Sequence, residues 1–165
     1  MKSKIKSFAK EIFIFAVTLI IISNAISYYK SNDLKKENLT IKKLILIDGS
    51  IYTFPKNKAV LVHFWGTWCP ICKLEATNID AISKNFEVIT IAVDSKSNKN
   101  IQEYLKNNNV NYKVYNDINS KYASNFNIQV YPSSFIYNKK GELLFTEVGY
   151  TSTYGLKLRM WWASL

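Results

Sequence analysis

Both cysteines of this 165-residue chain stand at C-x-x-C spacing, as Cys69 and Cys72, between an apolar run and a helix-like segment. Residues 59–65 are almost continuously apolar, which is typical of a strand buried on both faces. From Pro70 onward, apolar residues recur at helical spacing, so the first thiol is expected in the first turn of a helix. Unpaired N–H groups and the positive end of the helix dipole favour a thiolate there. The sequence therefore predicts a reactive thiol where a buried strand meets a helix.

Two structural roles compete with redox chemistry at this motif. A structural zinc site needs about four ligands, and the chain offers two cysteines and one histidine. A structural disulfide that closes so short a loop would restrain the unfolded chain little. We therefore expect a redox-active dithiol, in which Cys69 is the nucleophile and Cys72, one helical turn on, resolves the mixed disulfide.

The N-terminus carries a basic tail over 1–11 and an uncharged, apolar stretch over 12–29. A membrane-spanning helix needs about 20 apolar residues, with about 17 as the lower limit. Lysines before the stretch predict a single-pass signal-anchor in the inner (cytoplasmic) membrane, with the rest of the chain on the periplasmic, extracytoplasmic side. A cleaved signal peptide is the alternative, because residues 23–25 are small enough for an export peptidase. Both alternatives export the remaining chain.

The net charge is +10, but the lysines are scattered instead of clustered in a nucleic-acid-binding module. We therefore expect no nucleic-acid partner and a basic surface with some attraction to anionic lipid. No cofactor is expected, because the chain has no glycine-rich phosphate loop and Cys72 is followed by Lys73 instead of the histidine of a haem-attachment motif.

The remaining chain divides into a polar linker over 30–43 and one domain over 44–165. Asp48-Gly49 is a favoured hairpin turn between two apolar runs. We expect strands over 44–47, 51–54, 59–65, 87–93, 112–115, 134–137 and 143–148, and helices over 70–86, 100–109, 120–126 and 152–163. Strands that alternate with helices and end in a hairpin and a helix predict an α/β domain, with a mixed central sheet and helices on both faces.

Two segments resemble the thioredoxin superfamily. Residues 64–72, F-W-G-T-W-C-P-I-C, are similar to its active-site segment, and residues 130–133, V-Y-P-S, are similar to its cis-proline loop. The resemblance implies a thioredoxin fold in which Pro132 is a cis-proline, and a loop that faces the cysteines and pairs with the substrate backbone. It also implies that Trp68 and Tyr131 contact substrate, whereas Trp65 belongs mainly to the core.

Within the superfamily, the chain most resembles the membrane-anchored TlpA/ResA-like group, because of its anchor, its early hairpin and the segment 94–117. His63 and the segments 147–151 and 155–162 resemble the suppressor-of-copper-sensitivity D proteins, also called protein disulfide oxidoreductases. The resemblance covers about residues 40–165. We expect the terminal Trp161-Trp162 pair to serve helix packing.

Two further residues are candidates for proton transfer. His63 occupies the position of the buried aspartate that relays protons in thioredoxin, and a neutral histidine there could accept a proton near pH 7. The alternative is a core histidine bonded to a neighbour. Glu75 matches a glutamate of the TlpA/ResA-like active site, and its alternative is a solvent-facing residue on the helix.

Together these features predict an exported thiol–disulfide oxidoreductase that reduces disulfides in protein substrates. A reductase outside the cytoplasm needs electrons, so the resemblance implies an integral-membrane electron donor as a partner. An oxidase or an isomerase is the alternative within this class. A copper-binding protein that uses Cys69 and Cys72 as ligands, with His63 as a further candidate ligand, is the alternative from another class, because thiolates suit Cu(I).

Overall fold

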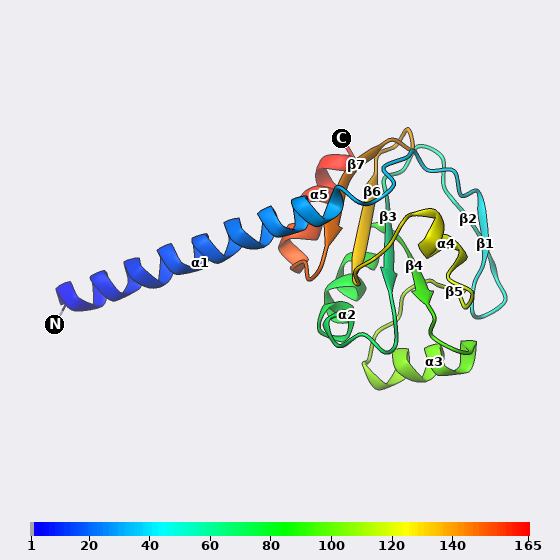
Figure 1. Ribbon diagram of the computed structural model, residues 1–165, viewed down its shortest axis with the longest axis horizontal. Coiled ribbons are helices and arrows are strands. Elements are labelled where there is room, and N and C mark those ends of the chain that lie inside the picture. The colour runs from blue at the N-terminus through cyan, green and yellow to red at the C-terminus, as the bar shows by residue number, and fades with distance from the viewer. Residues whose placement is uncertain (1) are drawn as a thin grey trace.

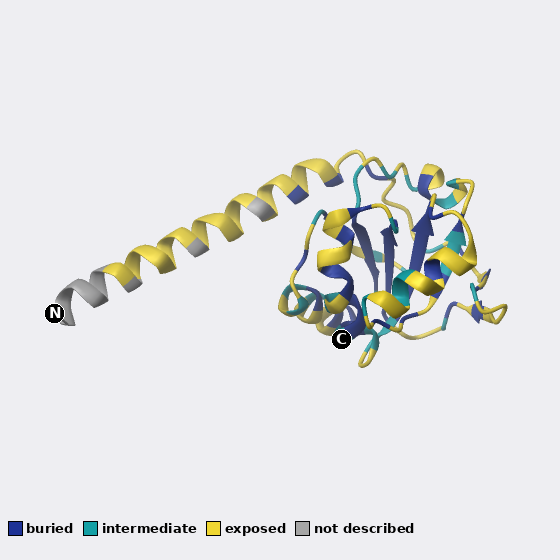
Figure 2. Cartoon of the chain, turned by 90° about the horizontal axis from the view of Figure 1, so that it is seen from below, coloured by how far each residue is buried: buried dark blue, intermediate teal, exposed yellow. Residues whose placement is uncertain are grey.

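A computed structural model describes residues 2–165, except for the side chains of residues 2–7, 9, 16 and 23. The expected basic tail over 1–11 therefore lies largely outside the described side chains. The helix α1, Lys2–Ser31, is continuous and projects away from the domain (Figure 1). Its stretch Lys10–Ser31, 22 residues, is long and apolar enough to cross a membrane and is mostly exposed (Figure 2).

The domain is built on a five-stranded sheet of order β5-β4-β3-β6-β7. The strands are β3 (Val60–Trp65), β4 (Glu87–Val93), β5 (Val114–Asp117), β6 (Ser133–Tyr137) and β7 (Leu143–Val148). β3, β4 and β5 are parallel to one another, whereas β6 and β7 are antiparallel to their neighbours. This is the expected mixed sheet, and β3, which has a strand on each side, is buried along its whole length.

Alternate residues of β3 enter two different cores. Leu61 and Trp65 pack with α2 (Pro70–Ser83), α3 (Asn98–Asn107) and α5 (Thr153–Ala163). Val62 and Phe64 pack on the other face, with α4 (Lys121–Asn125) and the N-terminal hairpin. Period-2 alternation in a strand with two buried faces produces this division. The predicted helices on both faces of the sheet are confirmed.

The hairpin forms a small sheet of its own, in which β1 (Lys43–Ile45) pairs with β2 (Ile51–Thr53). Both strands are shorter than expected because the turn is wider than two residues and is closed by Leu46 N–H donating to Ser50 O over 2.8 Å. The Asp48 carboxylate accepts from the Ser50 N–H at 2.9 Å and holds this turn.

Residues 30–43 are more than a linker, which corrects the expectation from their polar composition. The helix α1 continues to Ser31, and Leu34 and Ile41 are buried in the core behind β3. The Lys35 N–H donates to Phe126 O at 3.1 Å, and the Leu39 N–H donates to Gly141 O at 2.9 Å. These bonds attach the segment to the domain.

Candidate active site

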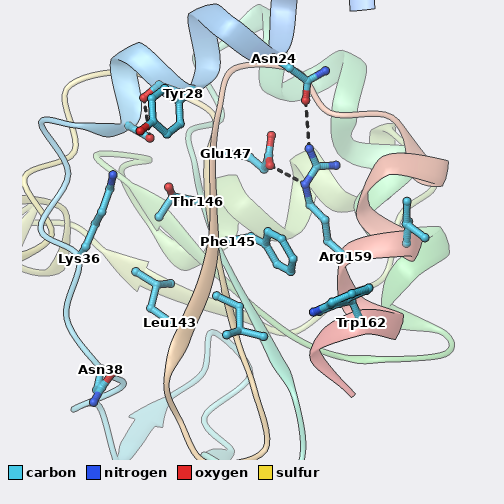
Figure 3. Close-up of a pocket in the computed structure, with 13 residues that line it drawn as sticks. Asn24, Tyr28, Lys36, Asn38, Leu143, Phe145, Thr146, Glu147, Arg159 and Trp162 are labelled. Atoms are coloured by element: carbon cyan, nitrogen blue, oxygen red, sulfur yellow. Dashed lines mark hydrogen bonds and ion pairs between the residues drawn. The ribbon is translucent and has the colours of Figure 1, made fainter. Parts of the chain in front are cut away.

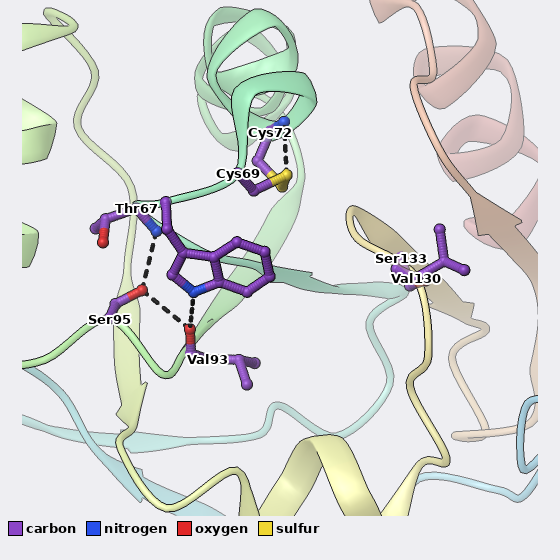
Figure 4. Close-up of a disulfide and its surroundings, with 8 residues drawn as sticks. Thr67, Cys69, Cys72, Val93, Ser95, Val130 and Ser133 are labelled. Atoms are coloured by element: carbon purple, nitrogen blue, oxygen red, sulfur yellow. Dashed lines mark hydrogen bonds between the residues drawn. A yellow bond between two sulfur atoms is a disulfide. The ribbon is translucent and has the colours of Figure 1, made fainter.

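The two cysteines lie where β3 ends and α2 begins, as expected. Cys69 is the N-cap of α2, Pro70 occupies its first turn, and the Cys69 Sγ accepts the Cys72 N–H at 3.1 Å (Figure 4). The two residues form a disulfide with a Cα–Cα distance of 5.3 Å. Cys69 is 5% exposed and Cys72 is 1% exposed. A thiolate at Cys69 would therefore receive the helix N–H groups and be the more accessible of the two.

An aromatic surface lies beside the disulfide. The Trp68 side chain is 55% exposed, and its Nε1 donates to Val93 O at 3.1 Å (Figure 4). Its ring meets the ring of Tyr131 edge-on, with 5.3 Å between the centroids. The indole also covers Gly66, where an added Cβ would lie 2.7 Å from it. The structure thus joins Trp68 and Tyr131, the two expected substrate contacts, in one surface, whereas Trp65 is buried.

Ser95 fixes the loop between β3 and α2, although the sequence reading missed it. Its hydroxyl accepts the Thr67 N–H at 3.0 Å and donates to Val93 O at 3.1 Å. Its position just after β4 could have predicted a place near the cysteines, because the carboxyl ends of parallel strands meet at one edge of a sheet.

The loop before β6 lies at the same end of the sheet as the cysteines, because Ser133 pairs with Phe64 near the end of β3. The Tyr131–Pro132 peptide bond is cis, as the resemblance implies. The Ser133 hydroxyl donates to Val130 O at 2.7 Å, and the Gly149 N–H donates to Pro132 O at 2.8 Å. These two bonds hold the loop in place.

Glu75 lies one turn after Cys72 on α2 and is only 1% exposed, so the solvent-facing alternative is wrong. Its Oε1 accepts the Thr151 N–H at 3.1 Å, and no described group bonds to its Oε2. Burial raises the pKa of Glu75 to about 8; the Thr151 bond opposes this shift and the nearby Glu147 adds to it. The carboxyl is therefore largely protonated at pH 7 and ionises as the pH approaches 8.

A second buried carboxylate, Glu147, lies at the end of β7 and is paired. Its Oε1 lies 2.6 Å from the Nε of Arg159 on α5. Burial raises the pKa of Glu147, although the Arg159 guanidinium and the Ser27 hydroxyl oppose the shift. The sequence reading did not identify this pair, because nothing local in the sequence joins β7 to α5.

His63 is buried on β3, and its Nδ1 lies 2.9 Å from the Ser134 hydroxyl on β6. Burial lowers the pKa of His63 to about 3, so the ring is neutral at physiological pH. This is the bonded core histidine that was the alternative to a proton carrier. The low pKa makes His63 a weaker proton acceptor than Glu75, and its proton role stays a prediction. Among the described side chains, no three of the types His, Cys, Asp and Glu are grouped to hold a metal ion.

Known proteins are similar to this chain over most of its length. The model of the AhpC/TSA family matches residues 31–146. A thioredoxin-like protein of Haemophilus influenzae is 28% identical over 163 residues, covering 97% of each chain. Sporulation thiol-disulfide oxidoreductase A of Bacillus subtilis is 28% identical over 111 residues, covering 62% of this chain and 67% of that protein.

The fold is also that of a solved structure. The crystal structure of StoA from Bacillus subtilis matches with a TM-score of 0.63 and 23% identity, covering 76% of this chain and 98% of that chain. The expected thioredoxin fold is therefore confirmed. The family match and the ResA-named relatives, among them a Bacillus subtilis protein 28% identical over 94 residues, agree with the TlpA/ResA-like resemblance.

Proposed function

This chain belongs to the AhpC/TSA family, and we propose that it is an enzyme, a thiol–disulfide oxidoreductase that reduces disulfides in exported proteins. One observation carries the proposal. The Cys69–Cys72 disulfide caps α2, one helical turn from the buried carboxyl of Glu75. The aromatic surface of Trp68 and Tyr131 beside this disulfide supplies a contact area for a polypeptide.

The reaction begins from the reduced dithiol. The Cys69 thiolate attacks one sulfur of the substrate disulfide, so that the substrate S–S bond breaks and its other sulfur leaves as a thiolate. The Cys72 sulfur then attacks the Cys69 sulfur, breaks the mixed disulfide and releases the second substrate thiolate. Two electrons pass to the substrate, and the Cys69–Cys72 disulfide forms.

Glu75, in its ionised form, is the group that takes the proton of Cys72 in the second step, so this step speeds up as the pH rises toward 8. A free cysteine has a pKa of about 8.5, and the pKa of Glu75 is raised by burial to about 8. Proton transfer is efficient between groups of similar pKa near the working pH. The i, i+3 spacing places the two side chains on one helix face. Pro132 and its loop hold the substrate backbone opposite Cys69 in this account.

The proposed location is the inner membrane, with the domain on the periplasmic side. The length of the Lys10–Ser31 stretch and the lysines before it support an uncleaved anchor. Lys30 in the last turn of α1 and Leu34 just after that helix share a small cavity with Val130 and Ser133 of the cis-proline loop. The dithiol site would then lie near the membrane surface, within reach of an integral-membrane electron donor.

Trapping of the mixed disulfide tests the proposal. The Cys72→Ser variant should accumulate disulfide-linked substrate on Cys69, whereas Cys69→Ser should neither trap nor reduce substrate. Mass spectrometry of the trapped species identifies the linked cysteine. Trapping through Cys72 in the Cys69→Ser variant would reverse the assignment.

A further inference from the structure

The helix α5 is apolar on two opposite faces. Leu156, Met160 and Ala163 are buried against the sheet and α2. The other face carries exposed residues at helical spacing: Tyr154 at 86%, Leu158 at 63%, Trp161 at 53% and Trp162 at 59% exposed. Our expectation that the tryptophan pair serves helix packing is therefore wrong. An apolar helix face is normally covered by a packing partner, so the exposed outer face of α5 is expected to have one.

This outer face lies beside the end of α1. The Arg159 Nη2 donates to Asn24 Oδ1 at 3.1 Å (Figure 3). The Ser27 hydroxyl accepts the Val148 N–H at 2.9 Å. A groove of about 870 Å³ separates α1 from α5 above the edge strand β7, and Tyr28 and Trp162 are among its lining residues. In Figure 1, α5 lies on the side of the domain toward which α1 projects.

The length of α1 fixes the depth of these contacts. The uncharged stretch begins at Ile12, and Asn24 follows twelve positions later, which is about 18 Å along a helix at 1.5 Å per residue. The hydrocarbon core of a bilayer is about 30 Å thick. Asn24 and Ser27, which already touch the domain, would therefore still lie within the outer leaflet, and so would the neighbouring face of α5.

We propose that the outer face of α5 is immersed in the outer leaflet of the membrane that holds α1, where phospholipid covers Leu158, Trp161 and Trp162 and fills the groove along β7. This rests on the proposed anchoring by α1. Tryptophan and tyrosine favour the membrane–water interface. The exposed lysines Lys36 and Lys157 border this region, so the lipid that fits is one with an anionic headgroup.

The immersion would also fix the direction in which the dithiol site opens. With both α1 and α5 held by lipid, the domain can no longer rotate about the single tether. The cis-proline loop beside Lys30 would then face a membrane-embedded donor in one orientation, which lowers the entropic cost of docking.

Tryptophan quenching in the full chain tests the proposal. The protein is reconstituted in phosphatidylglycerol and phosphatidylethanolamine vesicles, with or without bromine on the acyl chains. Bromine should quench part of the emission, and the Trp161→Phe/Trp162→Phe variant should lose this quenched part, because Trp65 is buried in the sheet and Trp68 lies at the dithiol site. An equal quenched fraction in both proteins would overturn the proposal.

Two further variants, each with one tryptophan added to the Trp161→Phe/Trp162→Phe background, sharpen the result. Leu158→Trp places a reporter on the outer face of α5, and Ile51→Trp places one at an equally exposed position on β2, away from α1. Only the Leu158→Trp signal should be quenched. If neither is quenched while the protein stays in the vesicles after a carbonate wash, the immersion is wrong and the anchoring stands. Release of the protein by the wash would overturn the anchoring itself.

Discussion

The backbone N–H of Thr151 donates to the Oε1 of Glu75, 76 positions earlier in the chain, at 3.1 Å. This bond joins the helix that carries the cysteines to the connection between β7 and α5. It satisfies one carboxyl oxygen, while the other has no bonded partner among the described residues. A buried carboxyl in this state favours its protonated form, so the ionised fraction of Glu75, which grows as the pH approaches 8, is the proton acceptor we assign.

Replacement of Glu75 by glutamine should slow disulfide reduction at pH 7 by about 100-fold, the lower end of the usual contribution of a positioned acid or base. The amide fills the same space but cannot take the Cys72 proton. The pH–rate profile of the wild type should bend near pH 8, the raised pKa of Glu75, and this bend should vanish in the variant. The exposed Glu103→Gln on α3 is the control. A bend near pH 8 that survives in Glu75→Gln would assign it to another group.

The same carboxyl should make stability depend on pH. Its pKa is about 8 in the folded chain against an ordinary value of 4.5. Between these values the folded chain holds a proton that the unfolded chain releases, so the folded state loses stability as the pH rises. The free energy of unfolding of the wild type, relative to that of Glu75→Gln, should fall between about pH 4.5 and about pH 8. Outside that window the two curves of unfolding free energy against pH should run parallel. Urea unfolding at several pH values measures this, and parallel curves throughout would contradict a buried, protonated Glu75.

The surface around Trp68 should matter for protein substrates and not for small disulfides. Trp68→Ala removes the ring that meets Tyr131, and Gly66→Ala places a Cβ 2.7 Å from the present position of the indole. Both variants should raise KM for a disulfide-bonded protein while leaving the reaction with a small aromatic disulfide nearly unchanged. Ile51→Ala, far from the site, is the control. Equal losses with both kinds of substrate would indicate damage to the dithiol instead.

The ion pair between Glu147 and Arg159 should contribute to stability. Its side chains are 11% and 21% exposed, so Arg159→Met leaves a largely buried carboxylate unpaired and should cost about 2–3 kcal/mol, somewhat below the range for a fully buried pair. The double variant Glu147→Gln/Arg159→Met should recover much of this loss. Denaturant unfolding of the wild type, the double variant and the two single variants, Arg159→Met and Glu147→Gln, completes the cycle, and an additive double variant would show that the two residues do not interact.

The parts of the fold that depend on local patterns were predictable. The apolar run over 59–65 predicted β3, and the turn residues Asp48-Gly49 predicted the hairpin of β1 and β2, each within a few positions. The position of Cys69 as a helix cap also followed from the sequence. The burial of Glu75 did not, because it depends on α5 packing over α2, and a helix glutamate has the same local signature whether exposed or covered.

Long-range packing explains the other differences. Ser95 acquires its role only because β4 lies beside β3. The segment before the hairpin has the composition of a spacer, yet Leu34 is buried because its neighbours bond to distant loops. For Trp161 and Trp162, an apolar pair on a helix predicted packing, and the structure leaves both exposed on the face opposite the core.

The direction of electron flow is the central claim, and the redox potential of the Cys69–Cys72 pair tests it most directly. The full chain in detergent is equilibrated with glutathione or dithiothreitol mixtures of defined potential, and the fraction of free thiol is counted by alkylation. We predict a potential near that of thioredoxin, about −270 mV, which suits a reductase recharged from the membrane. A value above roughly −160 mV, toward the strong oxidants near −120 mV, would contradict the account and identify an oxidase.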